Sequence, residues 1–251
     1  MAKSKRVFQG GRLRTLGFSG IPSIFFSFSW ILEESLPCLK HLKIRVLPSA
    51  EGDVHSVLSL EPAALRPPAG FPLRVLDLHN ATLPWSPKYL SGLRELYPHF
   101  ENCLTEAAMT EDELLGILCA SPQLERLSLR RIRVGNSPRL PPKCVVLLPG
   151  LAYLSLESRP EVAGYILAHI DVSATLSLKI TALIFPQNAE KVPGLIFPND
   201  RVSKTLFSDP PMFKIGAMGH SIRFNIPSYS LTLQIGGCEI ESNFYPSLGT
   251  G

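Results

Sequence analysis

The sequence predicts an α/β fold in which short parallel strands alternate with helices along the chain. Two observations predict it. The apolar pattern LxxLxL, with substitutions of like for like, returns six times, and self-similarity at a period of about 20 to 50 residues is typical of repeat architectures. Two of the segments between copies or after them have the apolar period of a helix. Together these patterns predict an irregular leucine-rich-repeat solenoid with a β-rich, irregular C-terminal part.

The six copies are unevenly spaced. They begin at residues 13, 39, 73, 93, 124 and 151, so successive copies lie 26, 34, 20, 31 and 27 residues apart. In each copy the last two apolar residues share one face of a short strand, and the first lies in the preceding turn. Because one such strand cannot bury its apolar face alone, we expect the copies to stack as parallel strands in chain order. The apolar residues are Leu13-Leu16-Phe18, Leu39-Leu42-Ile44, Leu73-Leu76-Leu78, Leu124-Leu127-Leu129 and Leu151-Leu154-Leu156, with a degenerate copy at Leu93 and Leu96.

Two connecting segments predict helices. In the first, Thr110 and Glu113 form a capping box ahead of an apolar face. In the second, Ser158 and Glu161 repeat this arrangement, with Pro160 in the first turn. The expected buried stripe of the second helix is Val162, Tyr165, Ile166 and Ile170. A further strand is expected at residues 176–180, which continues the alternation of helix and strand.

The character of the chain changes after residue 180. Proline becomes frequent, and strand-like runs with alternating apolar residues occur at residues 221–226 and 231–235. No helix of useful length is indicated there. We therefore divide the chain into a leucine-rich-repeat-like solenoid at residues 1–180 and an irregular β-rich continuation or cap at residues 181–251.

Composition narrows the classes of function. The chain has 25 basic and 21 acidic residues among 251, a balance that does not indicate a surface tracking nucleic-acid phosphates. Its five cysteines are an odd number without a CxxC pair, which suits neither a zinc site nor a disulfide framework. Free cysteines in apolar stretches indicate a reducing compartment, so we expect an intracellular protein, cytoplasmic or nuclear.

One apolar run raises the question of a membrane segment. Residues 21–32, IPSIFFSFSWIL, follow a basic stretch, but the run is interrupted by serines and closed by Glu33 and Glu34. A membrane-spanning helix needs about 20 apolar residues, which is more than this run supplies. We interpret it as a buried core segment and expect no association with a membrane.

No pattern of catalytic residues is recognisable. A GxSxG elbow, a GxxxxGK[ST] loop and a GxGxxG turn are all missing from the sequence. The six histidines are dispersed, and His169, at the end of a predicted helix, fits a structural role there. We expect no enzyme, and no catalytic, cofactor-binding or metal-binding residue. An enzyme of unrecognised type is the alternative, and it would need a pocket with clustered titratable side chains.

Four segments carry a family resemblance. LPCLKHLKIRV, FPLRVLDLHNATLPW, TEDELLGILCASPQLERLSL and LPGLAYLSLESRPEVAGYILAHIDV resemble the leucine-rich portion of the fungal F-box proteins. The resemblance covers most of residues 13–180, and the later IFPND and LFSDPPMFKIG are similar to segments that follow in that family. In such proteins an N-terminal F-box docks on the adaptor of a cullin-type ubiquitin ligase, while the repeats hold the substrate.

The resemblance implies a non-catalytic protein-interaction scaffold, similar to the substrate-recognition region of F-box ubiquitin-ligase receptors. The first residues run directly into a repeat without a recognisable F-box. We therefore expect binding to the cullin-ligase adaptor only if an F-box is present outside this chain. The protein partner held by the repeats is unknown. A truncated or decayed paralogue without a ligase role is the alternative.

Strand alternation indicates which residues could meet that partner. Side chains between the buried leucines point to the opposite face of their strands, and their mixed charges suit a protein better than a uniformly charged polymer. The same positions are also compatible with a merely solvated face. The candidate protein-binding residues are Lys43, Arg45, Asp77, His79, Ser128, Arg130, Ser155 and Glu157.

Overall fold

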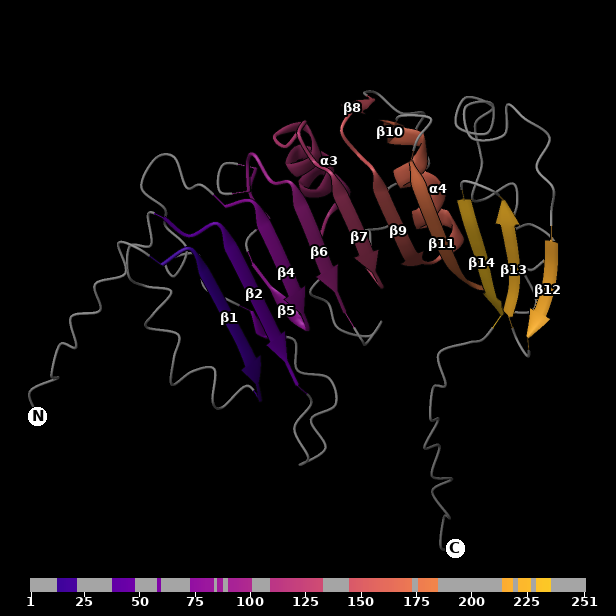
Figure 1. Ribbon diagram of the computed structural model, residues 1–251, viewed down its shortest axis with the longest axis horizontal. Helices are drawn as coiled ribbons and strands as arrows, with labels where there is room; N and C mark the ends of the chain where they lie inside the picture. Colours follow the sequence, from indigo (N-terminus) through magenta and orange to yellow (C-terminus); the bar gives the residue numbers. More distant parts are fainter. Residues whose placement is uncertain are drawn as a thin grey trace, which may run out of the picture.

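The structure is a computed structural model with mixed α/β character, dominated by one ten-stranded sheet (Figure 1). The strands of this sheet lie in the order β1-β2-β4-β6-β7-β9-β11-β14-β13-β12. The residues that the structure describes are 13–21, 38–47, 58–59, 73–83, 85–87, 90–100, 109–132, 145–172, 176–184, 214–218, 221–226 and 229–235.

Strands β1 to β11 of the main sheet pair in parallel, each with the next one along the chain. The parallel, sequential order expected for the six apolar copies is therefore confirmed, and the strand expected at residues 176–180 continues it. These strands are β1 (Thr15–Gly20), β2 (His41–Val46), β4 (Val75–His79), β6 (Glu95–His99), β7 (Arg126–Arg130), β9 (Tyr153–Ser158) and β11 (Ser177–Ile184).

Leucine columns run across one face of this sheet. Leu16 in the first copy is partly buried, but from the second copy onward the register aligns the second apolar residues in a column whose members are at most 4% exposed. Its members are Leu42, Leu76, Leu96, Leu127, Leu154 and Leu178. Neighbouring strands lie about 4.8 Å apart, so these side chains pack without a gap. Each buried leucine contributes roughly 1.5–3 kcal/mol relative to an exposed one, which makes this ladder a main source of stability.

The turn that leads into each strand repeats one backbone arrangement. Lys40 N and His41 N both donate to Arg14 O, at 2.8 and 3.0 Å. The same pair of bonds, from two successive N–H groups to one carbonyl of the preceding copy, recurs between later copies. Its acceptors are the carbonyls of Arg14, Lys40, Arg74, Arg94 and Glu125. Since buried backbone groups need partners, this arrangement satisfies each turn, although the copies differ in length.

Two helices within the described part lie on the apolar side of the sheet, α3 (Glu111–Cys119) and α4 (Pro160–His169) (Figure 1). The capping box expected for α3 is confirmed. Thr110 Oγ1 accepts from Glu113 N at 3.2 Å, and Glu113 Oε2 accepts from Thr110 N at 2.8 Å. Both bonds satisfy N–H groups that the first turn of a helix leaves free.

The cap expected for α4 at Ser158 is wrong, because β9 continues through this residue. Ser158 is only 3% exposed, and its hydroxyl donates to Arg159 O at 3.2 Å. Arg159 is the N-cap residue and makes no side-chain cap bond. Pro160 opens the helix as expected. At the other end His169 is buried, and its Nδ1 lies 2.8 Å from Tyr165 O, which fits the structural role expected for it.

The last three strands extend the same sheet. β14 (Tyr229–Ile235) pairs in parallel with β11, β13 (Ser221–Ile226) pairs antiparallel with β14, and β12 (Lys214–Met218) pairs antiparallel with β13. The strand-like runs expected at residues 221–226 and 231–235 are thus strands. The domain boundary expected after residue 180 falls inside β11, and hydrogen bonding of the sheet continues across it.

Short pairs of strands flank the main sheet. β8 (Val146–Leu148) pairs in parallel with β10 (Ile170–Val172), and β3 (Leu58–Ser59) pairs in parallel with β5 (Ala81–Thr82). Ile170, which was expected in the stripe of α4, is buried at the start of β10 instead.

Some expectations concern residues outside the described part of the chain, among them all but the first residue of the apolar run at 21–32. Neither helix of the described part is long and apolar enough to cross a membrane. Cys38 and Cys119, which are the described cysteines, are free thiols.

Replacement of Leu154 by alanine tests the leucine ladder. The side chain is fully buried, so Leu154→Ala should lower the free energy of unfolding by about 2–5 kcal/mol, as large-to-small core substitutions do. Ser155→Ala, one residue along on the opposite face, should change it by about 0.5 kcal/mol or less. Urea unfolding midpoints measure both effects, and equal shifts would contradict the assignment of the two faces.

Candidate functional site

The face of the sheet opposite the leucine ladder carries polar side chains in rows. All eight candidate protein-binding residues lie on this face: Lys43 and Arg45 are exposed, and the other six are half-buried. Their position agrees with the expectation that side chains between the buried leucines point to the opposite face of the strands. Their role in binding stays a prediction. One row contains Lys43, Asp77, Tyr97, Ser128, Ser155 and Lys179, and the next contains Arg45, His79, His99, Arg130, Glu157 and Thr181.

Strand β6 contributes residues that the sequence analysis missed. Glu95, Tyr97 and His99 lie on the polar face, between the residues expected from β4 and those expected from β7. These three residues could have been found from the same alternation of core-facing and polar residues along a strand that identified the other candidates. Because the copy at Leu93 and Leu96 has lost its third leucine, its alternate positions were not assigned to a face.

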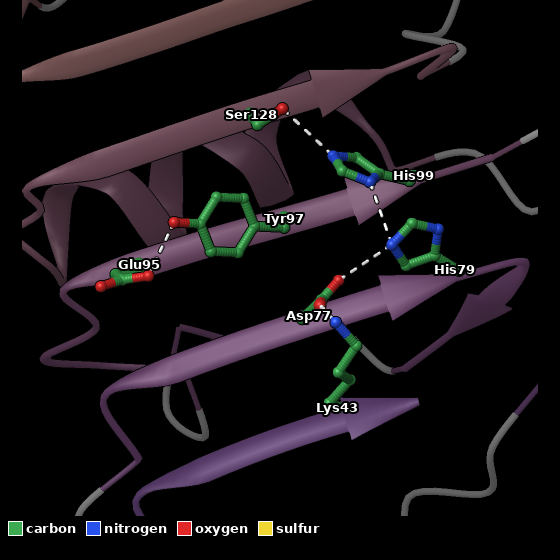
Figure 2. A network of polar contacts seen from close by, with 7 residues as sticks. All are labelled: Lys43, Asp77, His79, Glu95, Tyr97, His99 and Ser128. Atoms are coloured by element: carbon green, nitrogen blue, oxygen red, sulfur yellow. Dashed lines mark hydrogen bonds and ion pairs between the residues drawn. The ribbon is translucent and has the colours of Figure 1, made fainter. Parts of the chain in front are cut away.

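A chain of polar contacts crosses four strands at the centre of this face (Figure 2). Lys43 Nζ lies 2.7 Å from Asp77 Oδ2, and His79 Nε2 lies 3.2 Å from Asp77 Oδ1. His79 Nε2 also lies 3.2 Å from His99 Nδ1, and His99 Nε2 lies 3.1 Å from Ser128 Oγ. The contacts therefore link β2, β4, β6 and β7. We call Asp77, His79, His99 and Ser128 the histidine network.

Proline interrupts the sheet beside the histidine network. The paired positions of β6 and β7 are Glu95 with Arg126, Leu96 with Leu127 and His99 with Arg130, so the pairing skips Tyr97 and Pro98. Proline has no N–H group to donate to a ladder and is uncommon in central strands. His99 contacts Ser128, which lies diagonally across from it on β7, at the place where the regular pairing of β6 with β7 is interrupted.

Burial and neighbouring side chains shift the pKa values of Asp77 and His99 in the histidine network. Burial alone would raise the pKa of Asp77, but the contacts with His79 and Lys43 outweigh it and lower this pKa to about 2. Burial and the neighbouring His79 lower the pKa of His99 to about 4. At neutral pH Asp77 is therefore a carboxylate and His99 is a neutral imidazole.

Tyr97 adds an aromatic side chain to the same face. Its hydroxyl donates to Glu95 Oε2 at 2.6 Å (Figure 2). Burial, together with this carboxylate, raises the pKa of Tyr97 to about 12, so the phenol keeps its proton at neutral pH. The ring also meets His99 edge to face, with 6.3 Å between the ring centroids. These contacts hold the ring in one position.

A second group of charges lies at the ends of β7 and β9. Glu157 Oε1 lies 3.0 Å from Arg130 Nε and 3.4 Å from Arg131 Nε. Arg131 has a φ of 53°, in the left-handed region, and its N–H donates to Glu157 O at 2.6 Å. One carboxylate thus holds two guanidinium groups at the edge of the polar face.

The arrangement offers limited means for nucleophilic catalysis. Ser128 Oγ is within hydrogen-bond reach of His99, as in a nucleophile and base pair. A histidine with a pKa of about 4 is a weak base at neutral pH, however. Strand β7 is also paired on both sides, so its N–H groups lie in the plane of the sheet and not toward the polar face. Titratable side chains, which the enzyme alternative requires, are clustered on this face.

Comparisons of the chain with protein-family models, with curated proteins and with solved structures find no match. The polar face and its histidine network are the features of the described part from which a function can be inferred.

The low pKa of His99 gives the histidine network a pH dependence. The unfolded chain binds a proton on His99 near pH 6.5, but the folded chain does so only near pH 4. The stability that His99 contributes is therefore present above about pH 6.5 and is lost as the pH falls through this interval. Unfolding midpoints in a chelating buffer should fall between pH 7 and pH 4 for the natural chain.

Two variants isolate the contribution of His99 to that loss. His99→Gln should fall less steeply over the same interval because it lacks the titrating group. His41→Gln removes an exposed histidine from the same face and should fall as steeply as the natural chain. Equal slopes for all three proteins would contradict a neutral, half-buried His99.

Proposed function

We propose that the polar face is a protein-recognition surface on a leucine-rich-repeat solenoid. One observation carries the proposal, namely that the two helices of the described part both lie on the apolar side of a parallel sheet (Figure 1). Parallel sheets usually have both faces covered. Repeat solenoids differ, because they leave an extended face of parallel strands open for partners.

The solenoid assignment is supported by the repetition of local structure. Each copy supplies one strand, strand order follows chain order, and the leucine columns continue from copy to copy. The recurring pair of backbone bonds ahead of each strand has the same acceptor position in five successive copies. Such a stack needs contacts only between neighbouring repeats, which accommodates copies of unequal length.

The chemistry of the face favours a protein partner. Its charges are of both signs and largely paired with one another, as in Lys43 with Asp77 and Arg130 with Glu157, so it presents no uniform potential for a polymer of one charge. Tyrosine and arginine are the residue types enriched at the energetic centres of protein interfaces. Tyr97 lies half-buried among these charged groups, in contact with the side chains of Glu95 and Arg126.

Hydrogen bonds across the strands also prepare the face for binding. The side chains of Asp77, His79, His99 and Tyr97 are each held by at least one polar contact. Association normally costs roughly 0.5–1.5 kcal/mol for each flexible side chain that becomes fixed. Side chains that are already held lose less freedom, so a partner that fits this arrangement binds with less entropic cost.

The resemblance to fungal F-box proteins leads us to propose a more specific role, which is the substrate-recognition half of an intracellular ubiquitin-ligase receptor. In this role the polar face holds a substrate protein, and an F-box outside the residues of the resemblance recruits the adaptor. The proposal includes no catalytic step in this chain. A decayed paralogue would share the folded scaffold but would have no partner for the face.

Charge reversal on the polar face tests the recognition function. The variant Lys43→Glu with Arg130→Glu breaks two cross-strand ion pairs and reverses the charge of two side chains on the face. A protein captured by the natural chain should lose at least tenfold in affinity for this variant, or about 1.4 kcal/mol of binding free energy. Calorimetry with the purified partner measures the change.

The matched control is Glu161→Lys, an exposed position on α4. It should bind the partner as the natural chain does. Equal affinities for all three chains would place the binding surface elsewhere, and the absence of any specific partner would favour the decayed paralogue.

A further inference from the structure

Three potential metal-ligand atoms converge in the histidine network. Asp77 Oδ1, His79 Nε2 and the ring nitrogen of His99 all lie within 4.8 Å of one another. His79 Nε2 is 3.2 Å both from Asp77 Oδ1 and from His99 Nδ1. The two imidazole rings meet edge to face, with centroids 4.6 Å apart and an interplanar angle of 89°. Figure 2 shows the three side chains pointing toward one another from β4 and β6.

A single hydrogen atom satisfies the three ligand atoms of Asp77, His79 and His99 poorly. A hydrogen on His79 Nε2 can be directed well to only one of Asp77 and His99, or shared weakly between them, and a hydrogen on His99 Nδ1 would leave Asp77 facing a nitrogen lone pair. A hydrogen on each nitrogen would bring the two into collision. In agreement, Asp77 Oδ1 is buried and has no aligned hydrogen-bond donor, although His79 lies at an ion-pair distance. A buried acceptor without a donor is costly.

We propose that Asp77, His79 and His99 form a binding site for a first-row divalent transition metal such as zinc. Zinc takes histidine nitrogen and carboxylate oxygen at about 2.0–2.2 Å, so ligand atoms of a tetrahedral site are about 3.3–3.5 Å apart. Two of the separations here are 3.2 Å, and the third is no longer than 4.8 Å. One metal ion would engage the three lone pairs that a single hydrogen cannot.

The neighbouring residues support these ligands in the manner of outer-shell partners. His99 can bind the metal through Nδ1 because its other nitrogen, Nε2, is held by Ser128 Oγ at 3.1 Å. Lys43 Nζ holds Asp77 Oδ2 at 2.7 Å and leaves Oδ1 for the metal. Metal-binding histidines usually have their second nitrogen hydrogen-bonded, and metal-binding carboxylates are bonded as well.

Charge and ligand type select the class of ion. The ammonium group of Lys43 contacts Asp77 Oδ2, the carboxylate oxygen that is not the proposed metal ligand. Two imidazoles and one carboxylate suit zinc, nickel, copper or iron, whereas calcium and magnesium prefer sites made of oxygen ligands.

The metal site is independent of the protein-recognition function, although it lies on the same face. Three protein ligands leave one position of a tetrahedral ion for solvent or for a side chain of a bound protein. The proposal departs from the expectation that no histidine binds a metal. That expectation rested on spacing along the sequence, and His79 and His99 are 20 residues apart.

Zinc titration of the full, chelator-treated chain tests the site, with a competing fluorescent chelator to report free metal. The natural chain should bind one zinc ion, and its thermal unfolding midpoint should rise with zinc concentration because the folded state alone holds the site. His79→Ala and His99→Ala should each weaken binding by more than about 100-fold, and Ser128→Ala by about 10- to 100-fold, as for outer-shell partners.

His41→Ala is the matched control, because His41 is exposed on the same face and lies outside the histidine network. It should bind zinc as the natural chain does. Far-UV circular dichroism checks that each variant is folded, and His99→Gln replaces His99→Ala if the alanine variant is not. Zinc binding that survives both histidine changes, that is lost equally in His41→Ala, or that is no tighter than calcium binding would overturn the proposal.

Discussion

Burial of leucine side chains between neighbouring parallel strands is the constraint on which the rest of the structure depends. In each strand alternate residues point to opposite faces, so fixing Leu76 and Leu78 in the core directs Asp77 and His79 outward. A shift of the register by one residue would place charged groups against the apolar helices, which is strongly unfavourable. The buried face thereby determines which polar side chains meet on the open one.

The histidine network follows from this register and from one interruption of it. Asp77 and His79 are two apart on β4, and the pairing of β4 with β6 places His99 beside His79. Where Pro98 breaks the pairing of β6 with β7, His99 reaches Ser128 across the gap. The half-buried acceptors gathered there have too few hydrogens among them, which is unusual for a purely structural cluster. The proposed metal site therefore lies within the face that we propose for protein recognition.

Local patterns predicted much of the fold, since each LxxLxL copy specifies one strand and its buried face. The capping box of α3 was also readable, because Thr110 and Glu113 interact within one turn. The start of α4 could not be predicted in this way, because Ser158 belongs to β9. Only the pairing of β9 with a neighbouring strand shows that the strand extends to this residue. The proximity of His79 and His99 depends on strand register across 20 residues, and spacing along the chain does not contain this information.

The distance between strands β2 and β11 tests the continuous parallel stack most directly. Lys43 and Lys179 lie in the same row of the polar face, five strand spacings apart, which corresponds to about 24 Å between backbones. Spin labels at these two positions, in a chain whose native cysteines have been replaced, report this separation by double electron–electron resonance. A single narrow distribution near about 24 Å, allowing for the label arms, is the predicted result. A broad distribution, or one centred beyond about 35 Å, more than seven strand spacings, would contradict the stack.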